Sequence, residues 1–410
     1  MRMIDEMPVF GTHQDNTIEQ LTDVAARADR VALMADGHLG YIMPVGGVAA
    51  YRNLASVAGV GFDIACGNAA IQTNLEYADI AQRRMELADV IWNTVSFGIG
   101  RNNESDDAPT DDPLFEDPAW DAIPGTHERD KLKARARNQL GTVGSGNHYV
   151  DVFADEKGLV WVGVHFGSRG FGWNVAMGFM ALSQNEPWGK RVREAEALLD
   201  LDSPMGDAYW QLMTLAGQYA YVGREWVVRK VVELLGGEEV QLIHNHHNFA
   251  WKEEHLNLLT GEHEEFVVVR KGATPAFPGQ RGFVGGSMGD DAVIVEGSSD
   301  MRALETQQMA LFSTIHGAGR VMSRTEARGK INRKTGEIKK PGKVSPKMMA
   351  NWLREKDVVL RGGGLDESPH AYRRLPDVLT AQGDTIEVIH TLRPVVVVMA
   401  GANEFDPFKD

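Results

Sequence analysis

The sequence predicts an α+β fold in a single large domain, with mixed β-sheets flanked by helices. Short apolar runs typical of strands and longer helical patterns are intermixed, without the regular strand–helix alternation of a doubly wound parallel sheet. A chain of 410 residues is long enough to bury one very large core. We find neither an internal repeat nor a convincing linker, so the predicted domain spans residues 1–410.

The individual elements follow from their apolar spacing. Thr17 and Gln20 have the spacing of a capping box at the start of a first helix. Apolar residues then recur at helical intervals, at Ile18, Leu21, Val24, Ala25 and Ala28. A second helical pattern covers 207–235 and stops at Gly236 and Gly237. Runs rich in β-branched residues predict strands at 159–164, 240–243, 266–269, 292–295 and 395–398.

Charge is distributed unevenly along the chain. The net charge is −15, which by itself argues against a nucleic-acid partner. Acidic residues and prolines crowd residues 103–121, which predicts a solvated loop. Residues 320–361 instead hold thirteen Lys and Arg against four Asp and Glu. Such a run is often only a solvated surface, but this one begins inside the sharpest motif of the chain, which favours anion binding.

Neither end of the chain predicts a membrane or export signal. The longest uninterrupted apolar run, 395–402, is far too short to cross a bilayer. Asp5 and Glu6 lie where a secretory signal would carry basic residues. We therefore expect a cytoplasmic protein without a membrane partner.

The single cysteine and several histidines form an inventory of metal ligands. Cys66 lies three residues after Asp63, a spacing that lets a carboxylate and a thiolate face one site in a turn. His148 follows a glycine-rich loop, His165 ends a predicted strand, and 244–247 holds three more histidines at another strand end. Strand alternation prevents those three from all facing one way. Taken singly, a cysteine or histidine is more often a structural group.

The chemistry of these ligands leaves the metal open. Thiolate and imidazole together favour zinc or iron, because manganese sits at the weak end of the affinity order. Five candidate ligands are more than the number that one tetrahedral metal site takes. The surplus suggests two metal ions that share the thiolate.

His316 lies among small residues. It precedes Gly317 and Gly319, and Arg320 follows. A histidine that attacks phosphorus needs small neighbours for clearance and a cation for the phosphate charge. A structural loop histidine is the simpler alternative on this motif alone. Glycine-rich loops at 141–146, 167–170, 279–289 and 317–319 also allow backbone N–H groups to approach phosphate oxygens.

Together these motifs resemble the RtcB family of RNA ligases along nearly the whole chain. The resemblance is carried by Asp36-Gly-His-Leu-Gly40, Pro44-Val-Gly-Gly47, Asp63-Ile-Ala-Cys-Gly67, Gly141-Thr-Val-Gly-Ser-Gly-Asn-His148, Gly167-Ser-Arg-Gly170, His246-His-Asn248, Glu253, His255, Arg270-Lys-Gly-Ala-Thr274, Gly286-Ser-Met-Gly289, His316-Gly-Ala-Gly-Arg-Val-Met-Ser-Arg324, Asp366-Glu-Ser-Pro369, Ala371-Tyr372 and Thr391-Leu-Arg393. The element that begins at His316 is highly specific.

The resemblance implies an RtcB-like fold and a ligase that depends on GTP and manganese. Such an enzyme joins an RNA 3′-phosphate or 2′,3′-cyclic phosphate to a 5′-hydroxyl, in RNA repair or tRNA splicing. His316 would attack the α-phosphorus of GTP and carry the guanylate. RNA with these ends is the implied partner, and an activating protein is left unspecified.

The resemblance also assigns the other site residues. Cys66 would bridge two Mn²⁺ ions, with Asp63 and His247 completing one sphere and His148 and His165 the other. The phosphates would be bound, or their transfer assisted, by Arg169, Lys271 and Arg320. The guanylate would contact Asn147, Asp151, Ser287, Met288, Gly289, Gly317, Ala318, Gly319 and Tyr372.

The chain departs from the family pattern at several of these places. Ala65 and Asn68 replace a glycine and a methionine around Cys66, and Phe166 replaces a serine after His165. Asp151 stands where the family has a glutamate that reads the guanine base. Met399 stands where the family chain tends to end in a nucleotide-contacting lysine. A divergent paralogue is therefore expected, and whether Asp151 and Met399 change the guanine selectivity stays open from the sequence.

Two alternative functions remain open from the sequence. A metal-dependent cyclic phosphodiesterase would need the metal ligands but not His316. A catalytically silent RNA-binding paralogue would need neither, although it would have no reason to retain Asp63, Cys66, His148, His165, His247 and His316.

Overall fold

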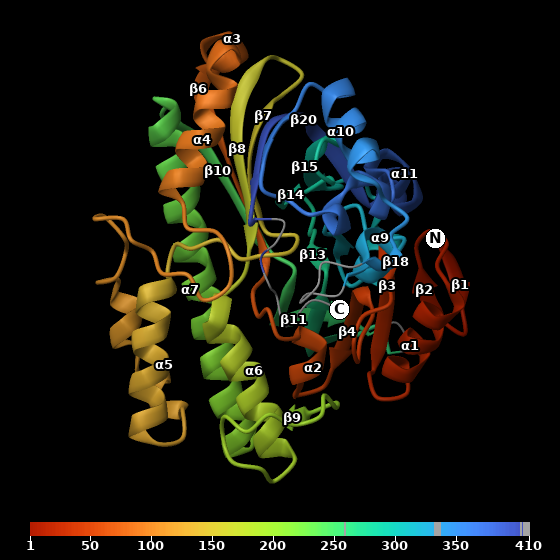
Figure 1. The fold of residues 1–410 in the computed structure, drawn as a ribbon. Helices are drawn as coiled ribbons and strands as arrows, with labels where there is room; N and C mark the ends of the chain where they lie inside the picture. Colours follow the sequence, from red (N-terminus) through yellow and green to blue (C-terminus); the bar gives the residue numbers. More distant parts are fainter. Residues whose placement is uncertain (258–259, 332–337, 402–403, 405–410) are drawn as a thin grey trace.

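The computed structural model describes residues 1–257, 260–331, 338–401 and 404. Mixed sheets and helices form a single α+β domain, which confirms the predicted fold class (Figure 1). Two large sheets carry most of the strands, and the chain passes from one to the other between β10 (Glu239–His246) and β11 (Asn248–Leu256).

The first sheet has six strands. Its order is β1 (Arg2–Ile4), β2 (Met7–Val9), β3 (Arg30–His38), β4 (Val45–Tyr51), β12 (His263–Lys271) and β11. Neighbours pair antiparallel except for β2 and β3, which are parallel.

The second sheet has eight strands. Its order is β10, β6 (Gly67–Glu76), β8 (Leu159–Phe166), β7 (Tyr149–Ala154), β20 (Ile386–Met399), β15 (Ala292–Gly297) and β14 (Arg281–Val284), with β19 (Val359–Arg361) parallel to β20. All five strands expected from the sequence lie within β8, β10, β12, β15 and β20. The short strand pairs are β13 (Ala273–Pro275) with β16 (Ser313–Ile315), β5 (Leu54–Ser56) with β9 (Leu198–Asp200), and β17 (Gly329–Ile331) with β18 (Ile338–Pro341).

Helices flank both sheets. The α-helices are α1 (Asp15–Ala25), α2 (Val57–Val60), α3 (Tyr77–Ile80), α4 (Arg84–Thr94), α5 (Thr126–Gln139), α6 (Arg169–Ser183), α7 (Pro204–Leu235), α8 (Leu304–Met309), α9 (Arg324–Arg328), α10 (Pro346–Glu355) and α11 (Leu375–Gln382). The 3₁₀ turns are η1 (Ala81–Arg83), η2 (Pro113–Glu116), η3 (Pro118–Ala122), η4 (Leu365–Glu367), η5 (Pro369–Ala371) and η6 (Gly383–Thr385). Within the described ranges, no helix is both long and apolar enough to cross a bilayer.

Helix α7 shows how sequence signals fix an element. Ser203 caps its N-terminus by accepting from the backbone N–H of Gly206, and Pro204 occupies the first turn. Gly236 ends it in the left-handed conformation, at φ 80°. Together with α4, this helix covers one face of the eight-stranded sheet (Figure 1).

The expected capping box of the first helix is wrong. Helix α1 begins at Asp15, two residues before Thr17, and Gln14 is its N-cap. The side chain of Gln20 instead exchanges hydrogen bonds of 3.0 Å with the backbone N–H and carbonyl of Gly40. The glutamine therefore holds the loop after β3 and does not cap its own helix.

The acidic segment is only partly a solvated loop. Its prolines begin η2 and η3, and these turns bury Phe115 and Trp120. The Trp120 ring stacks on Phe171 of α6 with centroids 4.6 Å apart. Apolar side chains between the carboxylates thus anchor the segment, while Glu116 and Asp121 pair with basic residues of α5 and Asp107 pairs with Lys230 of α7.

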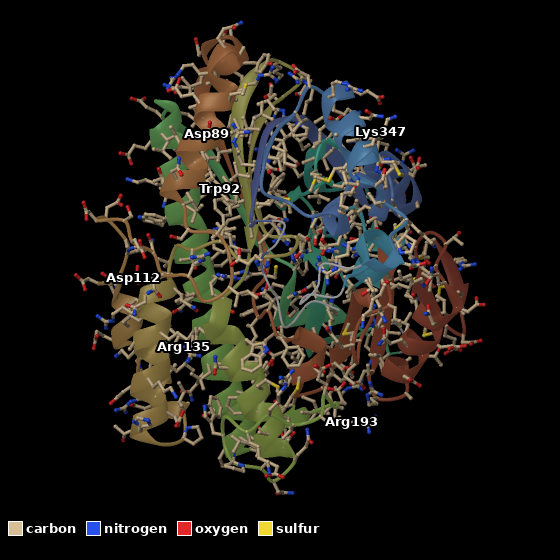
Figure 2. All side chains as sticks on the ribbon, in the orientation of Figure 1. Asp89, Trp92, Asp112, Arg135, Arg193 and Lys347 are labelled. Carbon is tan, nitrogen blue, oxygen red and sulfur yellow. The ribbon has the colours of Figure 1, made fainter. Side chains whose placement is uncertain are left out.

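The basic segment 320–361 combines site residues with an outer surface. Arg320 and Arg324 line the main pocket, whereas Lys347 lies on α10 at the molecular surface (Figure 2). Residues 332–337 lie outside the described part of this segment. In Figure 2, Lys347 and Asp112 of the acidic segment lie on opposite sides of the molecule.

Strand register places the predicted ligands together. In the eight-stranded sheet, Gly67 pairs with both His246 and Phe166. Tyr149 pairs with both His165 and Met399. The residues beside Cys66, His148, His165 and His247 are therefore aligned at one end of the sheet, where the six-stranded sheet begins.

Candidate active site

A pocket of about 970 Å³ lies at this junction and is lined from both sheets. It collects most of the residues predicted from the sequence, namely Asp63, Cys66, Asn147, Asp151, His165, His247, Lys271, Ser287, Met288, His316, Gly317, Ala318, Gly319, Arg320 and Tyr372. His148, Arg169 and Gly289 are not part of this lining.

The predicted metal ligands converge on the thiol of Cys66. Its Sγ lies 3.7 Å from Nε2 of His148 and 3.5 Å from Nε2 of His165. The ligand atoms of these three residues all lie within 4.8 Å of one another. Oδ2 of Asp63 is 2.9 Å from Nε2 of His148. One thiol, one carboxylate and two imidazoles thus point at a common space.

His247 contacts the same cluster through its ring. Its ring stacks on His165, with centroids 5.0 Å apart, and lies 4.9 Å from the ring of His316. His244 and His246 turn the other way and bind the buried Arg224 at 2.8 Å each. The expected alternation within 244–247 is confirmed.

The protonation states of this cluster fit a metal cation. Burial, followed by neighbouring histidines, lowers the pKa of both His165 and His247 well below the usual value, which keeps their imidazoles neutral. Burial and the charge of Asp63 raise the pKa of the Cys66 thiol, and a bound cation reverses that effect by replacing the proton. Among the described residues, Nδ1 of His247 is a buried polar atom without a partner.

His316 is held by a buried carboxylate. Oδ2 of Asp36 lies 2.6 Å from Nδ1 of His316 and accepts hydrogen bonds from the backbone N–H groups of His316 and Gly317 at 3.0 and 3.1 Å. Burial acts to raise the pKa of Asp36, but the charge and hydrogen bonds of His316 outweigh it, and the net shift is downward. A carboxylate at this distance favours a proton on Nδ1, which would leave the lone pair on Nε2.

The turn after His316 requires glycine. Gly319 adopts φ 72°, a conformation that side chains rarely tolerate. A Cβ at this position would lie 2.2 Å from the backbone oxygen of Asp36. The glycines of this motif therefore allow the His316 loop to pack directly against β3.

The pocket lining also contains the buried carboxyl group of Asp151. Met288, Val397 and Met399 belong to the same lining. Burial raises the pKa of Asp151 well above the usual range, and a hydrogen bond from the backbone of Val398 only partly opposes this. Its Oδ1 has no partner in the described part of the chain. The lining thus combines apolar side chains with one buried carboxyl oxygen that lacks a partner.

The predicted phosphate-binding cations differ in position. Lys271 lines the pocket, and its Nζ donates to the backbone oxygen of Ala58 at 3.2 Å. The guanidinium of Arg320 donates to the Tyr372 hydroxyl at 2.8 Å and to the backbone oxygen of Asp366. Arg169 lies outside the pocket lining and donates to the backbone oxygen of Gly98.

Sequence reasoning missed two side chains at this site. Asp36 belongs to a motif that carries the family resemblance, but no role followed from its position. Asn68 was noted only as a departure from the family, yet its Oδ1 lies 2.7 Å from Nδ1 of His165. Neither contact could be predicted from periodicity or spacing, because the partners are distant along the chain.

Comparison with known proteins places the chain in a family. The sequence model of the family described as "tRNA-splicing ligase RtcB" matches residues 17–400. The chain belongs to the RtcB family. The "RNA-splicing ligase RtcB" of Escherichia coli K12 is 32% identical over 395 residues, covering 90% of this chain and 89% of the relative. The "tRNA-splicing ligase RtcB" of Archaeoglobus fulgidus is 30% identical over 458 residues, covering 94% and 91%.

A further RtcB relative also aligns over nearly its whole length. The "tRNA-splicing ligase RtcB" of Thermococcus kodakarensis is 28% identical over 467 residues, covering 96% of this chain and 93% of the relative. These alignments run over nearly the whole of both chains.

Proposed function

We propose that this chain is a GTP- and manganese-dependent RNA ligase of RNA repair or tRNA splicing, acting in the cytoplasm. It joins an RNA 3′-phosphate or 2′,3′-cyclic phosphate to a 5′-hydroxyl. Membership of the RtcB family and the names of its relatives support the ligase class. One geometric observation carries the mechanism: an imidazole oriented by a buried carboxylate stands beside a thiol–imidazole cluster in one pocket.

His316 is the nucleophile in this proposal. Because Asp36 faces Nδ1, the lone pair of Nε2 attacks the α-phosphorus of GTP. The new N–P bond forms as the bond to pyrophosphate breaks. Water first opens a 2′,3′-cyclic end to the 3′-phosphate. An oxygen of the 3′-phosphate then attacks the guanylate phosphorus as the N–P bond to His316 breaks, and the 5′-hydroxyl attacks the 3′-phosphate, loses its proton and forms the phosphodiester as GMP leaves. Asp36 stabilises the positive charge that develops on the imidazole.

The metal ions are assigned to the thiol cluster. Cys66 would bridge two Mn²⁺ ions, with Asp63 and His247 as ligands of one and His148 and His165 as ligands of the other. Bound cations screen phosphate charge and align the in-line displacement. The two neutral imidazoles and the carboxylate are the protonation states that such ions need.

The nucleotide is assigned to the remaining lining. Asp151, Ser287 and Met288 would surround the base, and Tyr372 with Asn147 would contact the guanylate. The loops ending in Gly289 and formed by Gly317, Ala318 and Gly319 would approach it through their backbones. Lys271 and Arg320 would bind phosphates within the pocket. Arg169 would act from outside the lining through its charge on Asp63.

The test is RNA joining with defined ends. Purified protein, Mn²⁺ and GTP are incubated with one RNA that ends in a 3′-phosphate and another that begins with a 5′-hydroxyl. We expect joined product in wild type and none in His316→Ala. The matched control uses 3′-hydroxyl and 5′-phosphate ends, which should not be joined.

The same assay distinguishes the alternatives. Hydrolysis of a 2′,3′-cyclic phosphate that persists in His316→Ala, together with no joining by wild type, would select the cyclic phosphodiesterase. RNA binding without joining, hydrolysis or bound metal would select the silent paralogue. Either result would refute the ligase proposal.

A further inference from the structure

Asn68 contacts a predicted metal ligand through a side chain that the family pattern does not have at this position. It is fully buried in β6 and pairs directly across from His165 of β8. Its Oδ1 lies 2.7 Å from Nδ1 of His165. The family usually has a methionine here, which offers no strong acceptor for an imidazole N–H.

The orientation of the Asn68 amide is fixed by its other partner. Its Nδ2 donates to the backbone oxygen of Phe283 at 2.7 Å. A carbonyl oxygen only accepts, so the amide nitrogen must face Phe283 and Oδ1 must face His165. The amide is therefore locked at both ends inside the core.

This locked amide determines the tautomer of His165. Because Oδ1 only accepts, Nδ1 of His165 carries the proton and Nε2 keeps the lone pair. Nε2 is the atom that lies 3.5 Å from Sγ of Cys66 and faces Nδ2 of Asn147 at 3.5 Å. Both contacts agree with a lone pair on Nε2.

We propose that Asn68 is a positioning residue that holds His165 in the Nδ1–H tautomer and aims its Nε2 lone pair at the metal site. The proposal rests on the metal role assigned to His165 above. A partner of the second ring nitrogen fixes the ring orientation of a ligating histidine and raises its basicity, and losing such a partner typically lowers metal affinity about 10- to 100-fold.

The contact also ties the metal site to the nucleotide loop. Phe283 lies in β14, which runs into the glycine-rich loop at 285–289. Its carbonyl accepts from Asn68, and its N–H donates to Oδ1 of Asn245 at 3.0 Å. Asn245 is similarly buried and bonds the same residue, but it makes no hydrogen bond to His165 in the described part of the chain. It is therefore a matched control.

The first measurement is the tautomer of His165 in the full chain without metal. Nitrogen-15 NMR on histidine-labelled protein distinguishes protonated from unprotonated ring nitrogens, and His165→Gln assigns the signal. We expect a protonated Nδ1 in wild type and in Asn245→Met, and a shift towards protonated Nε2 or a mixture in Asn68→Met. A wild-type His165 protonated on Nε2 would overturn the proposal.

The second measurement is Co²⁺ affinity, followed by the thiolate-to-cobalt absorption band. We expect Asn68→Met to bind Co²⁺ about 10- to 100-fold more weakly than wild type. Asn68→Asp keeps an acceptor for Nδ1, so it should retain the tautomer and most of the affinity. Equal losses in Asn68→Met and Asn245→Met, or no loss in either, would contradict a positioning role.

Neither readout uses nucleotide or RNA. If the ligase proposal fails, the tautomer and the Co²⁺ affinities should still be as expected. If the inference about Asn68 fails, the wild-type protein should still join RNA. If Asn68→Met does not fold, the wild-type tautomer and the Asn68→Asp affinity still decide the question.

Discussion

Two carboxyl groups at the candidate site, those of Asp36 and Asp151, are both buried but have opposite protonation preferences. Asp36 accepts two backbone hydrogen bonds and faces His316, and its pKa is lowered. Oδ1 of each lacks a partner in the described structure, but no charged neighbour offsets the burial of Asp151, and its pKa is raised well above normal. The protein thus supplies the partner of Asp36 itself. Under the proposed function, the nucleotide base would be the partner of Asp151.

The difference distinguishes two kinds of site residue. A carboxylate that orients a protein group must be ionised before substrate arrives, because it prepares the nucleophile. A carboxylate that reads a base gains its partner only on binding, so an unsatisfied state without nucleotide is expected. The largest effect should therefore come from Asp36.

Replacing Asp36 by asparagine should slow covalent labelling of the protein by GTP about 10²- to 10⁴-fold. The amide removes the negative charge and permits the wrong tautomer of His316. Rates of label incorporation from α-labelled GTP measure the effect. Asp151→Asn is the control, and a comparable labelling rate in Asp36→Asn and wild type would erase the distinction between the two carboxylates.

Replacing Asp151 by asparagine should weaken GTP binding about 10- to 100-fold, the value of one hydrogen bond to a charged group. Nucleotide affinity is measured on His316→Ala protein, which prevents turnover. The order of preference among GTP, ITP and ATP should also change. An unaltered affinity and order would place the base elsewhere in the pocket.

The opposite pKa shifts predict opposite pH effects on stability. The ordinary pKa of both groups is 3.8. Folded Asp151 holds its proton more tightly than the unfolded chain, so its contribution to stability is lost as pH rises above 3.8 through the raised folded value. Folded Asp36 releases its proton more readily, so its contribution is present above 3.8 and is lost as pH falls through the lowered folded value.

Urea unfolding without nucleotide tests this sign. From about pH 5 to about pH 8, Asp151→Asn should gain stability relative to wild type, while the difference for Asp36→Asn should stay nearly constant. Parallel pH profiles for the two variants would show that their environments are alike.

Much of the fold, and the convergence of the candidate metal ligands, follows from local pattern. The convergence is predictable because each candidate stands at the end of a strand or in a glycine loop, and strand register then aligns them. The contact between Asp36 and His316 is not predictable in this way, because it joins residues 280 positions apart. The predicted capping box at Thr17 is wrong because the side chain of Gln20 hydrogen-bonds the backbone of Gly40 instead.

Replacing a surface carboxylate should have the smallest effect on stability and on labelling. Asp107 of the acidic segment is half exposed and pairs with Lys230 at 2.9 Å. A hydrogen bond from Ser105 and the pairing with Lys230 lower its pKa. Asp107→Asn should change the free energy of unfolding by no more than about 1 kcal/mol and leave labelling unaltered. A larger change, seen by urea unfolding, would mean that burial is not what separates Asp36 and Asp151 from other acidic groups.

The most direct test of the account is the location of the covalent guanylate. Wild-type protein is incubated with Mn²⁺ and α-labelled GTP, digested, and mapped by mass spectrometry under conditions that preserve acid-labile bonds. We predict a single modified peptide that contains His316, with the guanylate on Nε2 and no modification in His316→Ala. Label on another residue, or label that persists in His316→Ala, would contradict the central claim.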